Sequence, residues 1–328
     1  MHTNMKPTAV ALLLFLAVHA AADDGQHACA ALAEEEAAAM FQVQFAVPPA
    51  KPYNYTTFEL GAWPEDYPNC AGQPTPGLDH NEWQSPIDIT SRKAYDALPK
   101  HAAPRFQWQD KGCKGGYFFS SPTVWQVDLQ DSSLSDVDCT NLGMTFNGTE
   151  YSLVQFHFHA LSEHTLDFVP YAGEMHLVHA SADGKLLVVG VFMEECKFKP
   201  NAFLETVFKT GFVPALLLDF VIPLNPYKGV LSKGGHFWHY QGSLTTPPCD
   251  PGVTWLVAEK PVRVRTKYMD QFRAFLKAGA GDSYGHNSRP VQALNKRTIS
   301  KTFVSALSES NSTPLQLPLR YIDKALHV

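Results

Sequence analysis

The sequence has no apolar segment long enough to span a membrane and no concentration of basic residues. Its apolar run Ala9–Val18 is well short of the roughly 20 residues that a transmembrane helix needs. The C-terminal stretch R-Y-I-D-K-A-L-H-V lacks the hydrophobic tail of a lipid-anchor signal. The net charge is −6, and the 26 basic and 32 acidic residues are mixed along the chain. We therefore expect neither a membrane span nor a nucleic-acid partner.

A secretory signal explains the short apolar run better than a membrane anchor does. Lys6 gives the positive start, Ala9–Val18 the apolar core, and Ala20–Ala22 the small residues of a cleavage site. Residues 1–22 are predicted to be a signal peptide. The mature protein is then expected to be secreted or extracytoplasmic, within the secretory pathway.

The rest of the chain divides by composition. Residues 23–50 are rich in alanine, which predicts a short helical N-terminal extension that Pro48 and Pro49 end. Residues 51–300 carry the motifs described below and are expected to fold as one large domain. Residues 301–328 are expected to form a C-terminal extension, and they carry no motif.

Short runs of β-branched, aromatic and apolar residues between turn residues predict a mainly β domain. The predicted strands cover residues 124–129, 153–159, 174–181, 186–193, 216–220 and 254–258. The predicted helices cover residues 202–209 and residues 266–277, and the second has one apolar face and stops at Gly279.

Histidines share one face of two predicted strands. In L-V-Q-F-H-F-H, successive side chains point to opposite faces, so His157 and His159 lie on the same face as Gln155. In E-M-H-L-V-H, the same alternation places His176 beside Glu174. If the two strands are adjacent and antiparallel, three imidazoles converge on one point. Three nitrogen ligands without a fourth protein ligand are typical of a catalytic zinc site with an open position.

An alternative interpretation is a pair of hydrogen-bonded core histidines, which is the commoner meaning of an isolated H-x-H. The neighbouring polar residues favour the metal site. A ligating imidazole usually donates its other N–H to a carboxylate, amide or carbonyl group. Gln155 and Glu174 each lie two residues from a candidate ligand on the same face. We therefore predict Zn2+ as the cofactor.

The motifs resemble those of the α-class carbonic anhydrases and occur in the same order, from Tyr53 to Ile299. They are Q-S-P-I-D-I at 84–89, Q-F-H-F-H at 155–159, S-E-H-T at 162–165, E-M-H-L-V-H at 174–179, G-S-L-T-T-P-P at 242–248 and N-S-R-P-V-Q at 287–292. The resemblance implies a large, central, twisted and mostly antiparallel sheet with short helices and loops around it. It also implies reversible hydration of carbon dioxide to bicarbonate and a proton by zinc-bound hydroxide.

The resemblance assigns roles around the metal. Thr245 would orient the hydroxide, and Glu163 would accept the hydrogen of the Thr245 hydroxyl. His164 would be a buried structural residue, and Asn287 and Arg289 would support the site. The hydrophobic wall for the substrate would consist of Val178, Val188, Leu244, Val253 and Trp255. Each of these five side chains would be equally ordinary as part of a core.

One position departs from the family. Thr123 stands where the proton-shuttling histidine usually lies, so slow proton release is expected. The histidines that could replace it on sequence grounds are His80, His101, His236 and His239. A competing interpretation is a secreted zinc-bearing structural, storage or matrix protein on the same fold, with weak or no turnover. An esterase is a further alternative, but the bulky residues of the predicted wall make it secondary.

Six cysteines without a C-x-x-C spacing favour disulfides in a secreted chain. The resemblance implies a bridge between Cys70 and Cys249. The sequence does not determine how the other four cysteines pair. Cys113 and Cys139 flank one β segment, which suggests that pair, and Cys29 with Cys196 is then what is left. The glycosylation candidates are the sequons at Asn54, Asn147 and Asn311.

Overall fold

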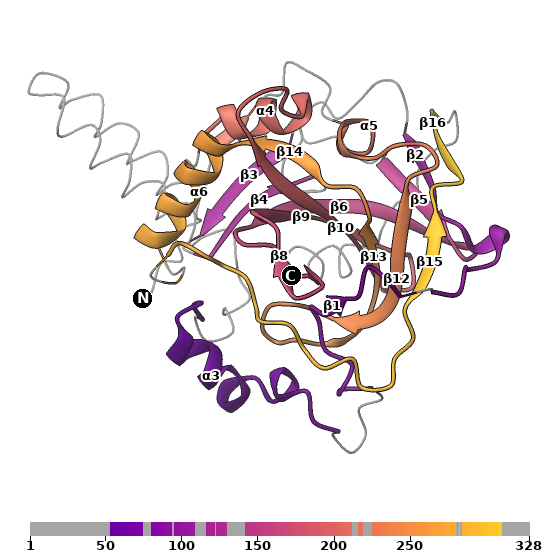
Figure 1. Ribbon diagram of the computed structural model, residues 1–328, viewed down its shortest axis with the longest axis horizontal. Helices are drawn as coiled ribbons and strands as arrows, with labels where there is room; N and C mark the ends of the chain where they lie inside the picture. The colour runs from indigo at the N-terminus through magenta and orange to yellow at the C-terminus, as the bar shows by residue number, and fades with distance from the viewer. Residues whose placement is uncertain are drawn as a thin grey trace, which may run out of the picture. The chain divides into compact units, whose positions relative to one another are not determined.

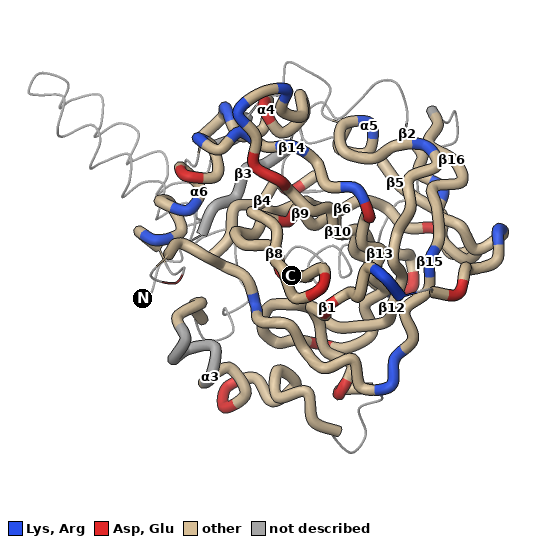
Figure 2. Tube along the Cα trace, in the orientation of Figure 1, with Lys and Arg blue, Asp and Glu red and all other residues tan. Residues whose placement is uncertain are grey.

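The computed structural model describes residues 53–74, 80–93, 95–108, 116–121, 123–129, 142–211, 216–218, 225–279, 282 and 284–309. The predicted signal peptide, the N-terminal extension up to residue 50, Cys29, Cys113, Cys139 and Asn311 lie outside these residues. No helix of the described part is long and apolar enough to cross a membrane. Basic and acidic residues are interspersed along the described chain (Figure 2).

A 13-stranded sheet forms most of the domain (Figure 1). Its main path runs β11-β3-β4-β6-β9-β10-β13-β12-β15, and β2, β5, β14 and β16 pair at its sides. Within this sheet, three pairings of the described strands are parallel, β10 with β13, β10 with β14, and β2 with β16, and the others are antiparallel. A small separate sheet has the order β1-β7-β8. The prediction of a large, mostly antiparallel sheet is therefore confirmed.

The strands of the large sheet are β2 (Arg105–Trp108), β3 (Gly116–Ser121), β4 (Val124–Asp128), β5 (Leu142–Phe146), β6 (Thr149–His159), β9 (Gly173–Ala180), β10 (Leu186–Cys196), β11 (Leu216–Leu218), β12 (His236–Ser243), β13 (Pro251–Ala258), β14 (Val262–Arg265), β15 (Ser300–Phe303) and β16 (Ala306–Glu309). Those of the small sheet are β1 (Asp88–Ile89), β7 (Thr165–Leu166) and β8 (Val169–Pro170).

Short helices accompany the sheet. They are α3 (Thr57–Asp66), α4 (Ala202–Lys209), α5 (Pro226–Val230), α6 (Thr266–Ala278) and the 3-10 helices at Pro68–Ala71 and Lys100–Ala102. Helix α4 begins where the Asn201 side chain accepts a hydrogen bond from the Leu204 N–H at 3.1 Å. Helices α4 and α6 are the two that the sequence predicts.

The central strands have a different chemistry on each face. On one face of β6, Phe156 and Phe158 join a large apolar core that also contains Phe208 of α4 and Phe272 of α6. The opposite face of β6 carries His157 and the other polar residues of the candidate site. The alternation of a β-strand thus separates the packing of the helices from the chemistry of the site.

The sheet extends beyond the domain boundary that the sequence suggests. Strand β15 begins at Ser300, the last residue of the expected domain, and pairs with β12, and β16 lies wholly within the segment expected to be a C-terminal extension. Strand β16 pairs in parallel with β2, which comes from the start of the domain. The sequence missed these strands because they form only by pairing with distant parts of the chain.

The disulfide implied by the family resemblance is present, between Cys70 and Cys249, with Cα atoms 5.0 Å apart. Both cysteines are buried. The expected pairing of Cys29 with Cys196 stays a prediction, because Cys29 lies outside the described residues; Cys196 is partly exposed and has no disulfide partner within the described part of the chain. Of the other sequon residues, Asn147 is exposed in the turn between β5 and β6, and Asn54 is partly buried.

Replacing both Cys70 and Cys249 with alanine should lower the free energy of unfolding. The bridge joins residues 179 positions apart. Closing so long a loop lowers the entropy of the unfolded chain, which stabilises the folded state by up to about 5 kcal/mol. Urea unfolding of the variant and the oxidised wild type measures the difference. Cys196→Ala is the matched control and should change stability little. An equal loss in both variants would show that the bridge has no special effect.

Candidate metal centre

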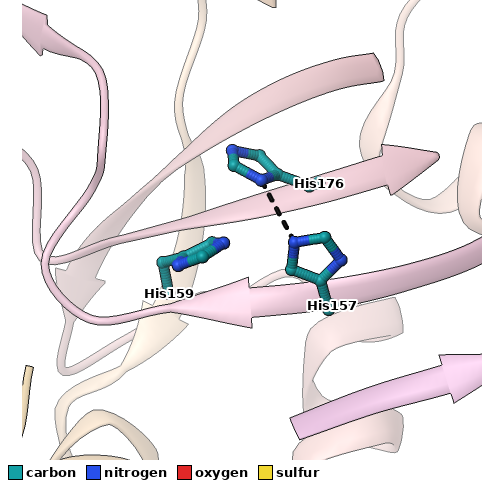
Figure 3. A group of neighbouring side chains, drawn as sticks. All are labelled: His157, His159 and His176. Atoms are coloured by element: carbon teal, nitrogen blue, oxygen red, sulfur yellow. Dashed lines mark hydrogen bonds between the residues drawn. The ribbon is translucent and has the colours of Figure 1, made fainter. Parts of the chain in front are cut away.

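Three imidazoles meet on the polar face of strands β6 and β9. The two strands are antiparallel, with His157 directly opposite His176. Figure 3 shows the rings of His157 and His159 on one strand and that of His176 on its neighbour, turned toward a common space. One nitrogen atom of each ring lies within 4.8 Å of the others, and His176 Nδ1 is 3.2 Å from His157 Nε2. All three rings are buried.

The second nitrogen of each ring contacts an oxygen atom that fixes the ring's orientation. These contacts are His157 Nδ1 to Gln155 Oε1 at 2.9 Å, His159 Nδ1 to the backbone oxygen of Asn287 at 2.8 Å, and His176 Nε2 to Glu174 Oε1 at 3.1 Å. A ring that donates an N–H to such an oxygen has its other nitrogen free to act as a ligand. The inward atoms are therefore Nε2, Nε2 and Nδ1.

Burial keeps the three rings neutral, which is the protonation state that binds metal. Burial lowers the pKa of His157 well below its usual value, that of His159 to about 4, and that of His176 as well. Within the described chain, His159 Nε2 is buried without a hydrogen-bond partner. A buried polar atom without a partner is costly. The donor set and this unsatisfied nitrogen fit a zinc ion with an open coordination position.

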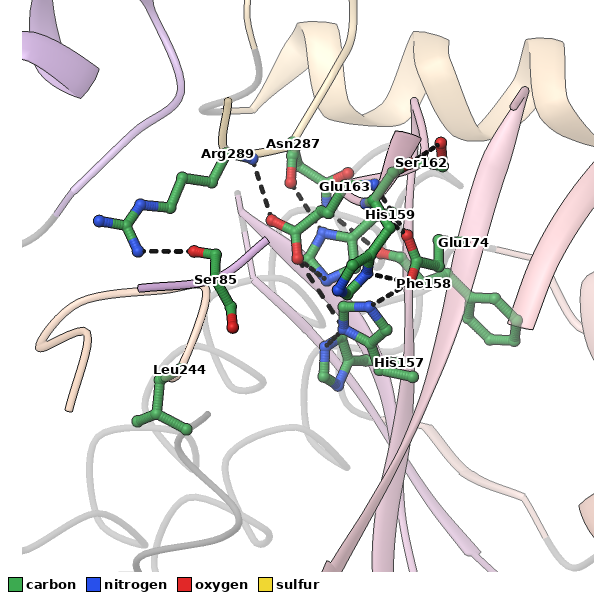
Figure 4. A network of polar contacts seen from close by, with 12 residues as sticks. Ser85, His157, Phe158, His159, Ser162, Glu163, Glu174, Leu244, Asn287 and Arg289 are labelled. Carbon is green, nitrogen blue, oxygen red and sulfur yellow. Dashed lines mark hydrogen bonds and ion pairs between the residues drawn. The ribbon is translucent and has the colours of Figure 1, made fainter. Parts of the chain in front are cut away.

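Glu174 connects the metal site to the loop that follows β6 (Figure 4). Its Oε1 lies 2.8 Å from His164 Nδ1 and 3.1 Å from His176 Nε2, and its Oε2 accepts the backbone N–H groups of Glu163 at 3.0 Å and His164 at 2.9 Å. Burial alone would raise the pKa of Glu174, but His164 and His176 hold it well below its usual value. Glu174 is therefore a buried carboxylate that accepts four hydrogen bonds.

His164, Glu174 and His176 are also close enough to one another to hold an ion. Both nitrogens of His164 are already engaged, however, because His164 Nε2 lies 2.7 Å from the Tyr240 hydroxyl. His164 is thus placed as a structural residue. Tyr240 belongs to none of the motifs that the sequence shares with the family. It lies two residues before Gly242, where the G-S-L-T-T-P-P motif begins. In a strand, residues two apart lie on the same face, and this spacing could have indicated that Tyr240 faces the site.

Thr245 lies close enough to Glu163 for its hydroxyl to lower the pKa of the carboxyl group, although 82 positions separate the two residues in the sequence. The backbone N–H of Arg289 donates to Glu163 Oε1 at 2.9 Å. Burial raises the pKa of Glu163 to about 7, against the opposing effects of His176, the Arg289 N–H and the Thr245 hydroxyl. Glu163 Oε2 has no hydrogen-bond partner among the described residues and lies 3.5 Å from His159 Nε2.

Asn287 and Arg289 hold separate chain segments around the site. Asn287 accepts the backbone N–H of Ala160 at 2.8 Å and donates to the backbone oxygen of Thr123 at 3.0 Å. The Arg289 guanidinium contacts Gln84 Oε1 at 2.8 Å and the backbone oxygens of Ser85 at 2.7 Å and Cys70 at 2.9 Å.

The five side chains expected to form an apolar wall belong to one buried cluster, and they are Val178, Val188, Leu244, Val253 and Trp255. Val188 on β10 lies between Val178 on β9 and Trp255 on β13. The Trp255 ring centroid is 4.9 Å from that of His176. An apolar surface therefore borders the metal site on the side of His176.

Residues 59–303 match the family model described as eukaryotic-type carbonic anhydrase. The chain belongs to this family. Human carbonic anhydrase 7 is 33% identical over 231 residues, which cover 56% of this chain and 86% of the human protein. Alpha carbonic anhydrase 5 of Arabidopsis thaliana is 36% identical over 220 residues, which cover 66% of this chain and 73% of that protein.

A solved structure agrees with this assignment. The alpha-carbonic anhydrase from Thermovibrio ammonificans, in complex with the inhibitor sulfanilamide, has a TM-score of 0.61 and 28% sequence identity. The match covers 77% of this chain and 100% of that one. The family predicted from the motifs is confirmed, and the chain is a carbonic anhydrase, a carbonate dehydratase that acts on a small molecule.

The four histidines considered as proton shuttles lie elsewhere in this carbonic anhydrase. His80 stacks on Trp83 with centroids 3.6 Å apart, and the His239 ring is 5.2 Å from that of Phe146 in the large apolar core. His101 is exposed in the 3-10 helix Lys100–Ala102, and His236 is exposed at the start of β12. Within the described chain, none of these four rings contacts the three imidazoles.

Another buried histidine, His179 on strand β9, lies outside the cluster of three and is expected to affect stability. His179 is buried, with Nε2 2.8 Å from the Tyr227 hydroxyl and Nδ1 3.2 Å from the Leu187 oxygen. Burial lowers the pKa of His179 to about 3. In the unfolded chain the ordinary histidine pKa is about 6.5, so the unfolded state binds the extra proton first. Stability should therefore fall as the pH drops below 6.5.

His179→Gln should make the stability of this carbonic anhydrase less dependent on pH. In the wild type, His179 lowers the free energy of unfolding by about 1.4 kcal/mol for each pH unit below 6.5. Glutamine does not titrate, so the variant lacks this decrease. Urea unfolding of the zinc-free proteins between pH 7 and pH 4.5 should show the two curves converging by about 2–3 kcal/mol. Parallel curves would mean that His179 does not stay neutral in the folded protein.

Proposed function

We propose that this enzyme catalyses the reversible hydration of carbon dioxide to bicarbonate and a proton, with Zn2+ held by His157 Nε2, His159 Nε2 and His176 Nδ1. The observation that carries the proposal is the set of three buried, neutral nitrogens that face one point, each anchored from behind. Zinc, when bound, supplies a nucleophile at neutral pH, because carbonic anhydrases lower the pKa of the coordinated water to about 7.

Thr245 and Glu163 orient the nucleophile in this proposal. The Thr245 hydroxyl can accept a hydrogen bond from it only if its own hydrogen is donated elsewhere. Glu163 is the acceptor, because its carboxylate is buried and stabilised in part by the Thr245 hydroxyl. Arg289 keeps the carboxylate in place through its backbone N–H at 2.9 Å.

The substrate is small, linear and apolar, so it needs an apolar surface beside the metal rather than a charged anchor. The wall from Val178 to Trp255 provides that surface next to His176. The backbone N–H of Thr245 is the proposed donor to a substrate oxygen, where negative charge develops. The same wall makes esterase activity secondary, because an ester needs a wider pocket.

Secretion is part of the proposal. The signal-like sequence of residues 1–22 and the bridge between Cys70 and Cys249 both suit an oxidising, extracytoplasmic compartment. Asn54, Asn147 and Asn311 remain candidates for glycosylation there. The alternative is a secreted zinc-bearing structural, storage or matrix protein with weak turnover. The intact His157, His159, His176, Thr245 and Glu163 favour the enzyme.

The enzyme should bind one zinc ion per chain, and His176→Ala should abolish both metal binding and carbon dioxide hydration. Removing one of three nitrogen ligands leaves too few to hold the ion. Metal analysis and stopped-flow hydration, with and without a sulfonamide, measure the two properties. His236→Ala, an exposed histidine on β12, is the control and should keep both. Full metal content in the His176 variant would refute the ligand assignment.

Proton release is proposed to limit turnover. Each cycle leaves a proton that must reach buffer, and a relay with a pKa near the operating pH is the efficient route. Thr123 cannot serve at neutral pH. Its backbone oxygen is nevertheless held by Asn287 at 3.0 Å, so position 123 is fixed beside the segment that supports His159.

Thr123→His should raise kcat by at least about tenfold at low buffer concentration, because it introduces such a relay. Added imidazole should likewise raise kcat of the wild type, while kcat/KM changes much less. Thr123→Gln is the control, because glutamine is similar in size to histidine but does not titrate, and this variant should have the kcat of the wild type. A wild-type enzyme that is fast and indifferent to buffer would show that another residue transfers the proton.

A further inference from the structure

Gly190 is an unusual residue for its position in the sheet. It lies within β10, Leu186–Cys196, where its neighbours Val189 and Val191 are fully buried apolar residues. Its Cα pairs with His176 on β9 and with Val257 on β13. Glycine weakens a strand interior, so it often marks a place where another group approaches the backbone closely.

The group that approaches is the Glu174 carboxylate. A Cβ atom added to Gly190 would lie 2.5 Å from Glu174 Oε1 and 3.6 Å from Glu174 Cδ. The next nearest atom is Val257 Cγ2 at 3.8 Å, which is ordinary van der Waals contact. Position 190 must therefore lack a side chain because of Glu174, since no other residue has an atom closer than 3.8 Å to the added Cβ.

Both oxygens of the Glu174 carboxylate make contacts that a displacement would disturb. Oε1, the atom that a Cβ would displace, contacts both His176 Nε2 at 3.1 Å and His164 Nδ1 at 2.8 Å. Oε2 of the same carboxylate accepts the backbone N–H of Glu163 at 3.0 Å. A displaced carboxylate would loosen a metal-facing imidazole and the segment that carries Glu163 at the same time.

We propose that Gly190 is a positioning residue for the hydration reaction. Its lack of a side chain admits the Glu174 carboxylate, which in turn fixes His176 and the backbone of Glu163 in one arrangement. The inference rests on the proposed function, because it assigns His176 to the metal. It adds that the metal site requires a glycine on a third strand, β10, which contributes no ligand.

Gly190→Ala should weaken zinc affinity by about tenfold or more, the size of effect typical when the partner of a ligating histidine is disturbed. Competition with a chelator measures the affinity. Gly229→Ala is the matched control. Gly229 lies in helix α5, and a Cβ added to it would lie equally close, 2.5 Å, to a side-chain atom, which is Phe203 Cβ of helix α4. The control should lower the unfolding midpoint but leave zinc affinity unchanged. Equal affinities in the wild type and Gly190→Ala would overturn the inference.

A double-mutant cycle tests whether the effect passes through Glu174. In a Glu174→Ala background, adding Gly190→Ala should cause little further loss of zinc affinity, because the carboxylate that the new methyl group would displace is absent. Glu174→Asp, with a shorter side chain, serves as the second background if Glu174→Ala does not fold. Additive losses in the background that folds would show that Gly190 acts by general packing, and this would overturn the inference.

The same cycle in zinc-free protein separates this inference from the proposed function. Thermal unfolding without metal reports the contact between positions 190 and 174 whether or not zinc is the cofactor. A wild type that fails to bind zinc would refute the proposed function, while coupling in the zinc-free cycle would still support the placement of Glu174 by Gly190. Additive midpoint shifts in a wild type that binds zinc would overturn the inference alone.

Discussion

The register between β6 and β9 is the constraint on which the rest of the site depends. His157 lies opposite His176, so the polar faces of both strands coincide and their apolar faces join one core. A slip of one residue would exchange the two faces of a strand. A slip of β6 would turn Phe156 and Phe158 toward His176 and place the imidazoles of His157 and His159 in the apolar core. Packing on one face therefore fixes the chemistry on the other.

Burial and hydrogen bonding act together on the ionisable residues that this register collects. Burial lowers the pKa of the three imidazoles, which keeps them neutral, and raises that of Glu163 to about 7. Glu174 is equally buried but remains charged because two imidazoles and two backbone N–H groups surround it. Two carboxylates eleven positions apart thus differ in pKa through their immediate partners.

Contacts from distant segments hold this arrangement in place. Arg289 joins the backbone oxygen of Cys70 to the segment that supports Glu163, so the disulfide and the site share one buried network. Asn287 connects the end of β6 with the residue before β4. Gly190 leaves space for the carboxylate of Glu174. Each residue acts by fixing the backbone or by leaving space, and none of them is a metal ligand.

The sequence by itself determined the family, the two strands that carry the three clustered histidines, the helices at residues 202–209 and 266–277, and the alternation that places His157 and His159 together. These features are local, because strand and helix periodicities and short motifs are written in consecutive residues. Only the tertiary structure decided that β15 and β16 complete the sheet, that Tyr240 holds His164, and that Gly190 lies against the Glu174 carboxylate. Those outcomes depend on contacts between residues far apart in the chain, and no local pattern encodes such contacts.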